Sequence, residues 1–392
     1  MLQATVLGKQ VYDITGRELD IGLLGLAEFL PAALLVLVTG SVADRFNRKI
    51  IGSIAIAGEL LCSVLLGLYA LSDPTAVWPL FVIAVLFGTF RAFAAPSVRS
   101  LPPMVAPDGA LPRTIALYSA TWTSAAIIGP ASGGLIYASS PALAYFVSAV
   151  LIGAGVAFLL AVKIARPFLK DQPKDPAEKV SLHTALAGLR FIRKTPILLA
   201  AISLDLFAVL FGGAVALLPA IAEDRLHVGD VAYGWLRAAP GIGAAIMAVL
   251  LASRPVTRKV GRTLLFVVGL FGIATVVLGV TTSYFVAFVA LVILAGADMI
   301  SVYIRGTLVP LVTPDDKRGR VMAVENVFIG ASNELGAFES GVAAHAFGTQ
   351  TAVIGGGIAT LGVVAMYSIF FPTLRNVDRF EDLEGHGDAI SQ

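Results

Sequence analysis

Long apolar runs separated by short polar segments fill almost the whole chain. A transmembrane helix needs about 20 apolar residues to cross roughly 30 Å of hydrocarbon. The runs that reach this length are Ile21–Val42, Ile50–Leu71, Trp78–Arg99, Leu111–Ser139, Pro141–Val162, Ile197–Ile221, Tyr233–Ala252, Thr263–Thr282, Tyr284–Val312, Arg320–Phe347 and Thr351–Phe371. This pattern predicts an all-α membrane protein with eleven complete spans.

A further run stands first and is incomplete. Only Met1–Tyr12 precedes the polar turn Asp13–Glu18, and this stretch is too short to cross a bilayer. Two interpretations are open: translation starts upstream of Met1, or the protein lacks most of one helix. We favour the upstream start, and we expect eleven full spans plus a remnant.

Composition supports a membrane location and excludes several other classes. Hydrophobic residues make up 57% of the 392 residues and charged residues only 14%, which leaves too little polar surface for a soluble domain. The net charge of +2 gives no reason to expect a nucleic-acid partner. The single cysteine, Cys62, excludes a cysteine-based zinc site. Nucleotide-binding and metalloprotease motifs are missing, so we expect no enzyme, no cofactor, no metal and no nucleotide.

Basic residues predict the orientation. They concentrate in every second connector and in the tail, as in the group Arg45, Arg48 and Lys49. The alternate connectors contain only Arg17 and Arg225. By the positive-inside rule, the basic connectors and the C-terminus are cytoplasmic in an inner or plasma membrane.

The chain divides at a long basic connector that contains several prolines. We expect an N-terminal helical lobe over residues 1–162, a linker over 163–194 with a short amphipathic piece at its end, a C-terminal lobe over 195–372 and a solvated tail over 373–392. An offset of 207 residues superposes Gly129 on Gly336 and Gly134 on Gly341. Parallel repeats joined by a cytoplasmic linker are typical of two-lobed secondary transporters.

Ionisable and amide side chains inside the spans mark candidate positions for a proton or substrate path. In the run Arg320–Phe347, polar residues recur every seven positions and so form one stripe. We interpret the stripe as a cavity lining, and the alternative is a hydrogen-bonded seam between lobes. Asp205 and Asp298 rank highest because no basic residue lies within one turn of either. The full candidate set is Glu28, Asp205, Asp298, Arg305, Glu325, Asn326, Asn333 and Glu334.

The loop Gly40-Ser-Val-Ala-Asp44-Arg45-Phe-Asn47-Arg48-Lys49 resembles the loop signature of the major facilitator superfamily. Asn47 replaces a glycine of that signature, and we expect it to keep a left-handed backbone. The resemblance implies two six-helix lobes that alternate between inward- and outward-facing states. It also implies that Asp44 latches one of these states, with Arg91 as its nearest matching partner.

A second motif in the fifth span, Gly129-Pro130-Ala-Ser-Gly133-Gly134, resembles the antiporter signature of drug-exporting members. The alternative is an ordinary helix-packing face of small residues. Further strings, such as those around Arg91, Arg318 and Glu334, look like the branch that contains the enterobactin exporter and the macrolide-efflux proteins. This resemblance implies export of a small amphipathic, drug-like or siderophore-like solute in exchange for protons.

Two other functions stay open at this point. A proton-coupled importer would share the fold, although the glycine–proline motif argues against it. A membrane receptor or assembly partner that transports nothing would fit the incomplete first span.

Overall fold

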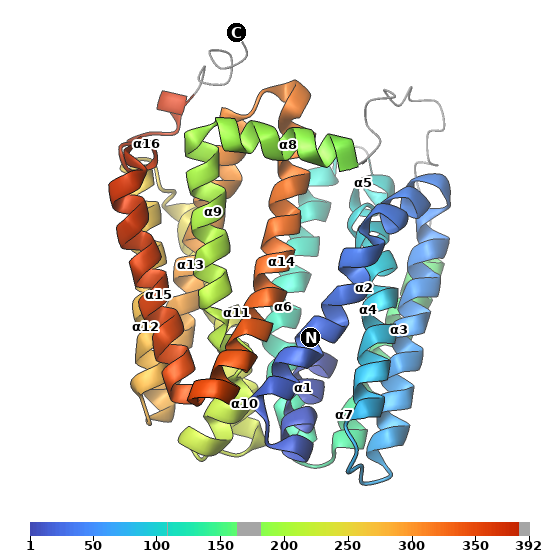
Figure 1. Ribbon diagram of the computed structural model, residues 1–392. Coiled ribbons are helices and arrows are strands. Elements are labelled where there is room, and N and C mark those ends of the chain that lie inside the picture. The colour runs from blue at the N-terminus through green and yellow to red at the C-terminus, as the bar shows by residue number, and fades with distance from the viewer. Residues whose placement is uncertain (108, 163–181, 384–392) are drawn as a thin grey trace. The chain divides into compact units, whose positions relative to one another are not determined.

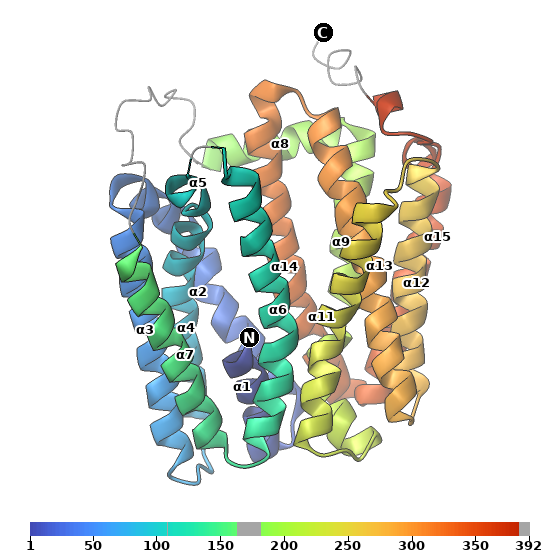
Figure 2. The same ribbon diagram turned by 180° about the vertical axis from the view of Figure 1, so that it is seen from behind.

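The computed structural model describes residues 1–107, 109–162 and 182–383, and over these residues the chain is helical, without strands (Figures 1 and 2). Ten of the eleven predicted runs coincide with one helix each, and the run Ile197–Ile221 covers a shorter helix and the short elements that follow it. The helices are α2 (Glu18–Arg45), α3 (Arg48–Ala70), α4 (Trp78–Arg99), α6 (Leu111–Tyr137), α7 (Pro141–Ala161), α9 (Pro196–Phe211), α11 (Asp230–Ser253), α12 (Val260–Val280), α13 (Tyr284–Val312), α14 (Asp315–Phe347) and α15 (Thr349–Phe370). The incomplete first run forms α1 (Leu2–Thr15). The all-helical prediction is confirmed.

Length and composition alone would allow eight helices of the described chain to cross a membrane. Helix α14 is not among them, because acidic and amide side chains interrupt its apolar residues.

One predicted span is broken. Helix α9 ends at Phe211 and is followed by the short elements η2 (Gly213–Val215), α10 (Leu218–Ala220) and η3 (Ile221–Arg225). Glycine favours such a break because its backbone loses the most freedom in a helix. A Cβ atom on Gly213 would lie 2.3 Å from the carbonyl oxygen of Gly336, so the break also lets α14 approach closely. The predicted span over Ile197–Ile221 lies within Pro196–Arg225, which is long and apolar enough to cross a membrane, although its helix is interrupted after Phe211.

The chain forms two compact units. The first contains residues 1–180 together with Gly229–Ala238, and the second contains residues 181–228 and 239–392. The core of the first unit joins α1, α3, α4 and α7 through side chains such as Leu7, Leu66 and Tyr145. The core of the second unit joins α9, α12, α13, α14 and α15. Helix α11 begins in the first unit and continues in the second.

Local capping explains where several helices begin and end. Asn47 precedes α3, and its side chain accepts a hydrogen bond of 3.0 Å from the backbone nitrogen of Lys49. The φ angle of Asn47 is −64°, so the expectation of a left-handed backbone was wrong: a capping residue needs an extended backbone instead. Gly16 has the left-handed backbone that ends α1 (φ 59°).

The linker and the tail are only partly described. Residues 163–181 and 384–392, which include most of the predicted linker, lie outside the described residues. The predicted amphipathic piece forms α8 (Leu182–Lys194). The start of the tail contains α16 (Pro372–Arg375) and η4 (Glu381–Leu383). It is not solvated as expected, because Leu374, Val377 and Leu383 bury their side chains in the core of the second unit.

Candidate functional site

A buried arginine with two acidic partners lies in the second unit. The Nη2 atom of Arg305 on α13 lies 2.7 Å from Oδ1 of Asp205 on α9. Its Nη1 atom lies 3.8 Å from Oε1 of Glu325 on α14. Its Nε atom donates a hydrogen bond of 3.4 Å to the hydroxyl of Ser301, one turn earlier on α13. Three helices therefore direct polar groups at one guanidinium.

Burial makes this arrangement energetically demanding. The exposed fractions of the side chains are 4% for Arg305, 7% for Asp205 and 11% for Glu325. A charge at the centre of a bilayer costs about 2.5–3.5 kcal/mol on insertion scales, so such a group persists only with partners. An arginine suits this role because its planar guanidinium carries five donors and stays charged.

Asp298 lies two turns before Arg305 on the same helix. Among the described residues it forms no hydrogen bond and no ion pair. The site therefore contains one cation and, with Asp298 included, three carboxyl groups. It can hold a proton on one carboxyl group while another still neutralises Arg305.

The polar stripe on α14 separates into two rows. Glu325 and Ser332 are buried on the side that packs within the second unit. Asn326 and Asn333 are exposed, and each amide donates to a carbonyl one turn earlier on α14, at 2.9 Å and 2.8 Å. Glu334 is half-buried and has an interaction partner. Of these residues, Glu325 forms the contact with Arg305 described above.

In the first unit, Glu28 on α2 faces Arg91 on α4. The carboxylate oxygen Oε2 of Glu28 lies 3.7 Å from Nη1 of Arg91. Gly88, one turn before Arg91, brings the two helices together: a Cβ atom there would lie 2.1 Å from the backbone oxygen of Glu28. The two side chains differ in exposure: that of Arg91 is 52% exposed and that of Glu28 is 15% exposed.

Helix α1 contributes a second group of buried polar side chains, which the sequence patterns did not single out. Lys9 forms an ion pair with Asp13 and lies 3.6 Å from a carboxylate oxygen of Asp230, at the start of α11. The hydroxyl of Tyr137 on α6 donates to Asp13 at 2.5 Å. Lys9 is nearly buried, with 8% of its side chain exposed.

Neighbouring positions on α1 extend this polar face. The hydroxyl of Tyr145 donates to Gln10 at 2.7 Å, and that of Ser63 donates to Gln3. The signal that could have identified the face is the spacing: Gln3 and Gln10 are seven residues apart, and Lys9 and Asp13 are four apart.

The loop motif is described only in part. Gly40, Asp44 and Arg45 lie at the end of α2, and the side chains of Asp44 and Arg45 are outside the described set. Arg48 is half-buried and has a partner. The ammonium of Lys49 donates to the carbonyl oxygens of Leu160 and Val162, at 2.7 Å and 2.8 Å, and so caps the end of α7.

The glycines of the fifth-span motif pack against two different elements. Gly129 and Gly133 on α6 face the start of α1: a Cβ atom on Gly129 would lie 2.7 Å from Cβ of Met1. Gly134 instead meets the first turns of α11, where a Cβ atom would lie 2.5 Å from Cα of Gly234. Pro130 lies inside α6, which continues through it.

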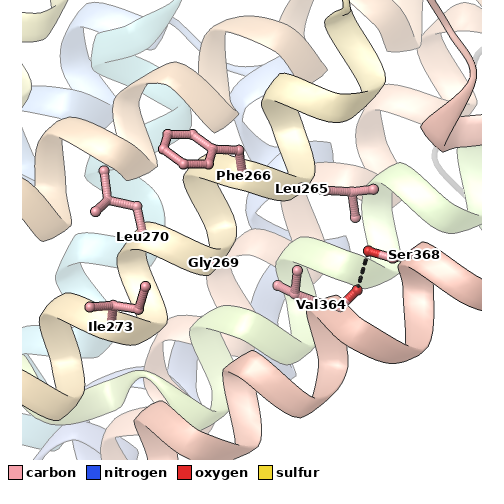
Figure 3. A pocket seen from close by; sticks show the side chains of 7 residues that line it. All are labelled: Leu265, Phe266, Gly269, Leu270, Ile273, Val364 and Ser368. Carbon is pink, nitrogen blue, oxygen red and sulfur yellow. Dashed lines mark hydrogen bonds between the residues drawn. The ribbon is translucent and has the colours of Figure 1, made fainter.

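An apolar groove of about 310 Å³ lies between α12 and α15 of the second unit (Figure 3). Its walls include Leu265, Phe266, Ile273 and Val364. The hydroxyl of Ser368 is turned to the carbonyl of Val364, at 2.7 Å, so it offers little to orient a polar solute (Figure 3). The groove contains none of the candidate ionisable residues.

Comparison with known proteins identifies relatives over most of the chain. The profile of a family described as transmembrane secretion effectors matches residues 3–387. An uncharacterized MFS-type transporter of Bacillus subtilis, YfiS, is 28% identical over 89% of this chain and 84% of its own length. The multidrug efflux pump Tap of Mycolicibacterium fortuitum is 27% identical over 93% of this chain and 90% of its own. Macrolide efflux protein A of Streptococcus pyogenes is 26% identical over 45% of this chain and 44% of its own.

Solved structures support the fold. A bacterial homologue of the human lysosomal transporter Spinster has a TM-score of 0.68 at 15% identity, covering 95% of this chain and 94% of its own. The nucleoside transporter NupG has a TM-score of 0.70 at 12% identity, covering 96% of this chain and 97% of its own.

Proposed function

Because the chain belongs to the transmembrane secretion effector family of major facilitator transporters, we propose that it exports a small amphipathic solute in exchange for protons. The efflux function named for Tap and for macrolide efflux protein A supports the direction of transport. The distribution of basic residues supports an inner or plasma membrane location with a cytoplasmic C-terminus.

The observation that carries the proposal is the buried arginine site. Arg305 lies between the carboxylates of Asp205 and Glu325, with Asp298 two turns away. A proton that binds to one carboxyl group releases Arg305 to the other. Protonation can therefore change which of α9 and α14 is held by α13, and this change couples proton movement to a conformational change.

The other candidate positions have supporting roles in this proposal. The Glu28–Arg91 pair of the first unit supplies a second charged position along the path. Asn333 and Asn326 are exposed on α14 and offer amide groups to a solute. The loop motif and the fifth-span glycines govern the change between states rather than bind the solute.

Everted membrane vesicles test the proposal. An imposed pH gradient, acidic inside, should drive accumulation of amphipathic dyes or macrolides into vesicles that contain the protein. Vesicles without the protein measure the passive trapping of basic solutes in an acidic lumen, and vesicles with the protein should accumulate solute faster and to a higher level. Nigericin should abolish this difference because it dissipates the pH gradient. Accumulation that persists in the presence of nigericin would contradict proton coupling. Transport only out of the everted vesicles would contradict export.

A further inference from the structure

Helix α8 is amphipathic, and its apolar face is buried in the second unit. Phe191 and Ile192 are 9% and 1% exposed and belong to the core that also contains Val321 and Val324 of α14. A Cβ atom on Gly188 would lie 2.8 Å from the carbonyl oxygen of Arg320, so the backbones of α8 and α14 approach closely. Figure 1 shows α8 lying crosswise over the ends of α9 and α14.

The opposite face of α8 is basic. Arg190, Arg193 and Lys194 are all exposed, and their spacing of three and four residues places them on one side of the helix. None of these three side chains forms an ion pair with a described residue.

The start of α14 extends this basic surface. The ammonium of Lys317 lies 5.0 Å from the ring centre of Phe191, which places it beside α8. Arg318, the next residue, is exposed, and Arg320, three residues after Lys317, is half-buried. The only acidic residues in these two segments are Asp315 and Asp316, whose side chains lie outside the described set. Together, α8 and the start of α14 contain six basic residues and two acidic ones, so this surface carries a net positive charge.

The depth of these cations follows from the sequence of α9. Lys194 lies two residues before Pro196, where an apolar helix begins whose single charged residue is Asp205. A helix that enters the hydrocarbon at Pro196 puts the last turn of α8 at the level of the lipid headgroups. At this level the exposed cations of α8 are within reach of lipid phosphate groups.

We propose that the α8 basic face, defined as Arg190, Arg193 and Lys194 with Lys317, Arg318 and Arg320, binds the phosphate headgroups of anionic phospholipids. Basic side chains next to a membrane attract acidic lipids by about 1 kcal/mol each. The packing of Phe191 and Ile192 holds the helix in place, so the site is formed before the lipid binds. This inference does not rest on the proposed transport function.

Native mass spectrometry of the purified protein tests the inference. The probes are dioleoylphosphatidylglycerol and dioleoylphosphatidylcholine, titrated separately. We expect tighter binding of phosphatidylglycerol, and a triple variant Arg190→Gln, Arg193→Gln, Lys194→Gln should lose roughly fivefold in affinity per neutralised cation. Phosphatidylcholine binding should not change. Equal binding of both lipids by the unaltered protein would overturn the proposal.

Two further variants distinguish a local site from an effect of bulk charge and from altered helix packing. Arg254→Gln, Lys259→Gln and Arg262→Gln remove three exposed charges before and at the start of α12, and this variant should keep the preference for phosphatidylglycerol. If this variant lost as much affinity for phosphatidylglycerol as the α8 variant, the preference would come from total charge, and a local site would be contradicted. The charge-preserving variant Arg190→Lys, Arg193→Lys, Lys194→Arg should retain binding. Its failure would assign the loss to altered helix packing.

A competition experiment tests whether the site binds the phosphate of a lipid headgroup or that of a soluble ester. Glycerol 1-phosphate carries the charged group without acyl chains. It should displace phosphatidylglycerol poorly, because it lacks the acyl chains that hold the lipid at the membrane surface. Displacement at equal concentrations would overturn a lipid site in favour of one for soluble phosphate esters.

Discussion

Arg305 determines what the acidic side chains around it can do. It is almost fully buried, yet its guanidinium reaches Asp205 on one side and Glu325 on the other. The two distances are unequal, at 2.7 Å and 3.8 Å, so Asp205 is the principal counterion in this state. A buried ion pair contributes little net stability by itself, but removal of one partner leaves an uncompensated charge.

Substitution of Asp205 should therefore have a large effect. Asp205→Asn leaves Arg305 with one distant carboxylate, and we expect a loss of about 3 kcal/mol in the free energy of unfolding. SDS-induced unfolding in mixed micelles measures this loss. The matched control is Asn333→Ala, which removes an exposed amide bonded to its own helix and should cost at most about 0.5 kcal/mol. Equal losses in the two variants would show that Asp205 is not the counterion.

A second prediction at the residue scale concerns Gly88 and the close packing of α4 against α2. Gly88→Ala inserts a methyl group 2.1 Å from the backbone oxygen of Glu28, so α4 must move away from α2. We expect a loss of about 1–3 kcal/mol in stability, together with separation of the Glu28–Arg91 pair. The control is Gly155→Ala on α7, where a Cβ atom meets nothing within 4 Å. Thermal unfolding of the purified protein should separate the two variants, and a Gly88→Ala midpoint as high as that of the control would contradict close packing.

At the scale of elements, α1 is a packed part of the first unit. Four of its polar side chains are buried: Gln3, Thr5, Lys9 and Gln10. Their partners come from α3, α7 and the start of α11, as well as from α1 itself. A short helix that holds so many buried polar contacts is fixed by them as well as by its apolar face.

Charge balance at the end of α1 can be tested directly. Lys9→Gln leaves Asp13 and Asp230 facing each other without the ammonium between them, and we expect a loss of about 2–3 kcal/mol in the free energy of unfolding. The double variant Lys9→Gln, Asp13→Asn removes one of the two negative charges and should recover part of that loss. Double-mutant analysis of micellar unfolding measures the coupling. Additive losses would contradict an interaction between the two side chains.

The elements were largely predictable, because a bilayer demands long apolar runs and such runs are visible in any sequence. The break after Phe211 was not, since Gly212 and Gly213 do not lower the hydropathy of their surroundings. The fold of the tail was missed for a related reason: Leu374, Val377 and Leu383 are too scattered to form a run, and only the folded core shows where they go.

The site was predictable in its members but not in its pairings. Asp205, Arg305 and Glu325 stand out because charged residues are rare inside apolar runs. Asp205 seemed unaccompanied because its partner comes from another helix, and one sequence gives no information on which helices are neighbours. Lys9 was overlooked because α1 was interpreted as a remnant.

At the scale of the whole molecule, family membership and the buried arginine site both support the proposal of proton-coupled export. Two proteins that this chain is similar to, Tap and macrolide efflux protein A, are named for efflux. In the proposed function, the site with one cation and three carboxyl groups is where a proton is exchanged for the solute. The account therefore predicts that substrate transport and proton movement depend on the same residues.

The most direct test is proton flux in liposomes that contain the purified protein and a trapped pH-sensitive dye. Addition of an amphipathic substrate should release protons in the opposite direction to the solute. The variants Asp205→Asn and Glu325→Gln should lose this proton signal, while Glu381→Gln, which alters an exposed carboxyl group on η4 outside the site, should keep it. Substrate transport with no proton signal in the unaltered protein, or a full signal in both acidic variants, would contradict the account.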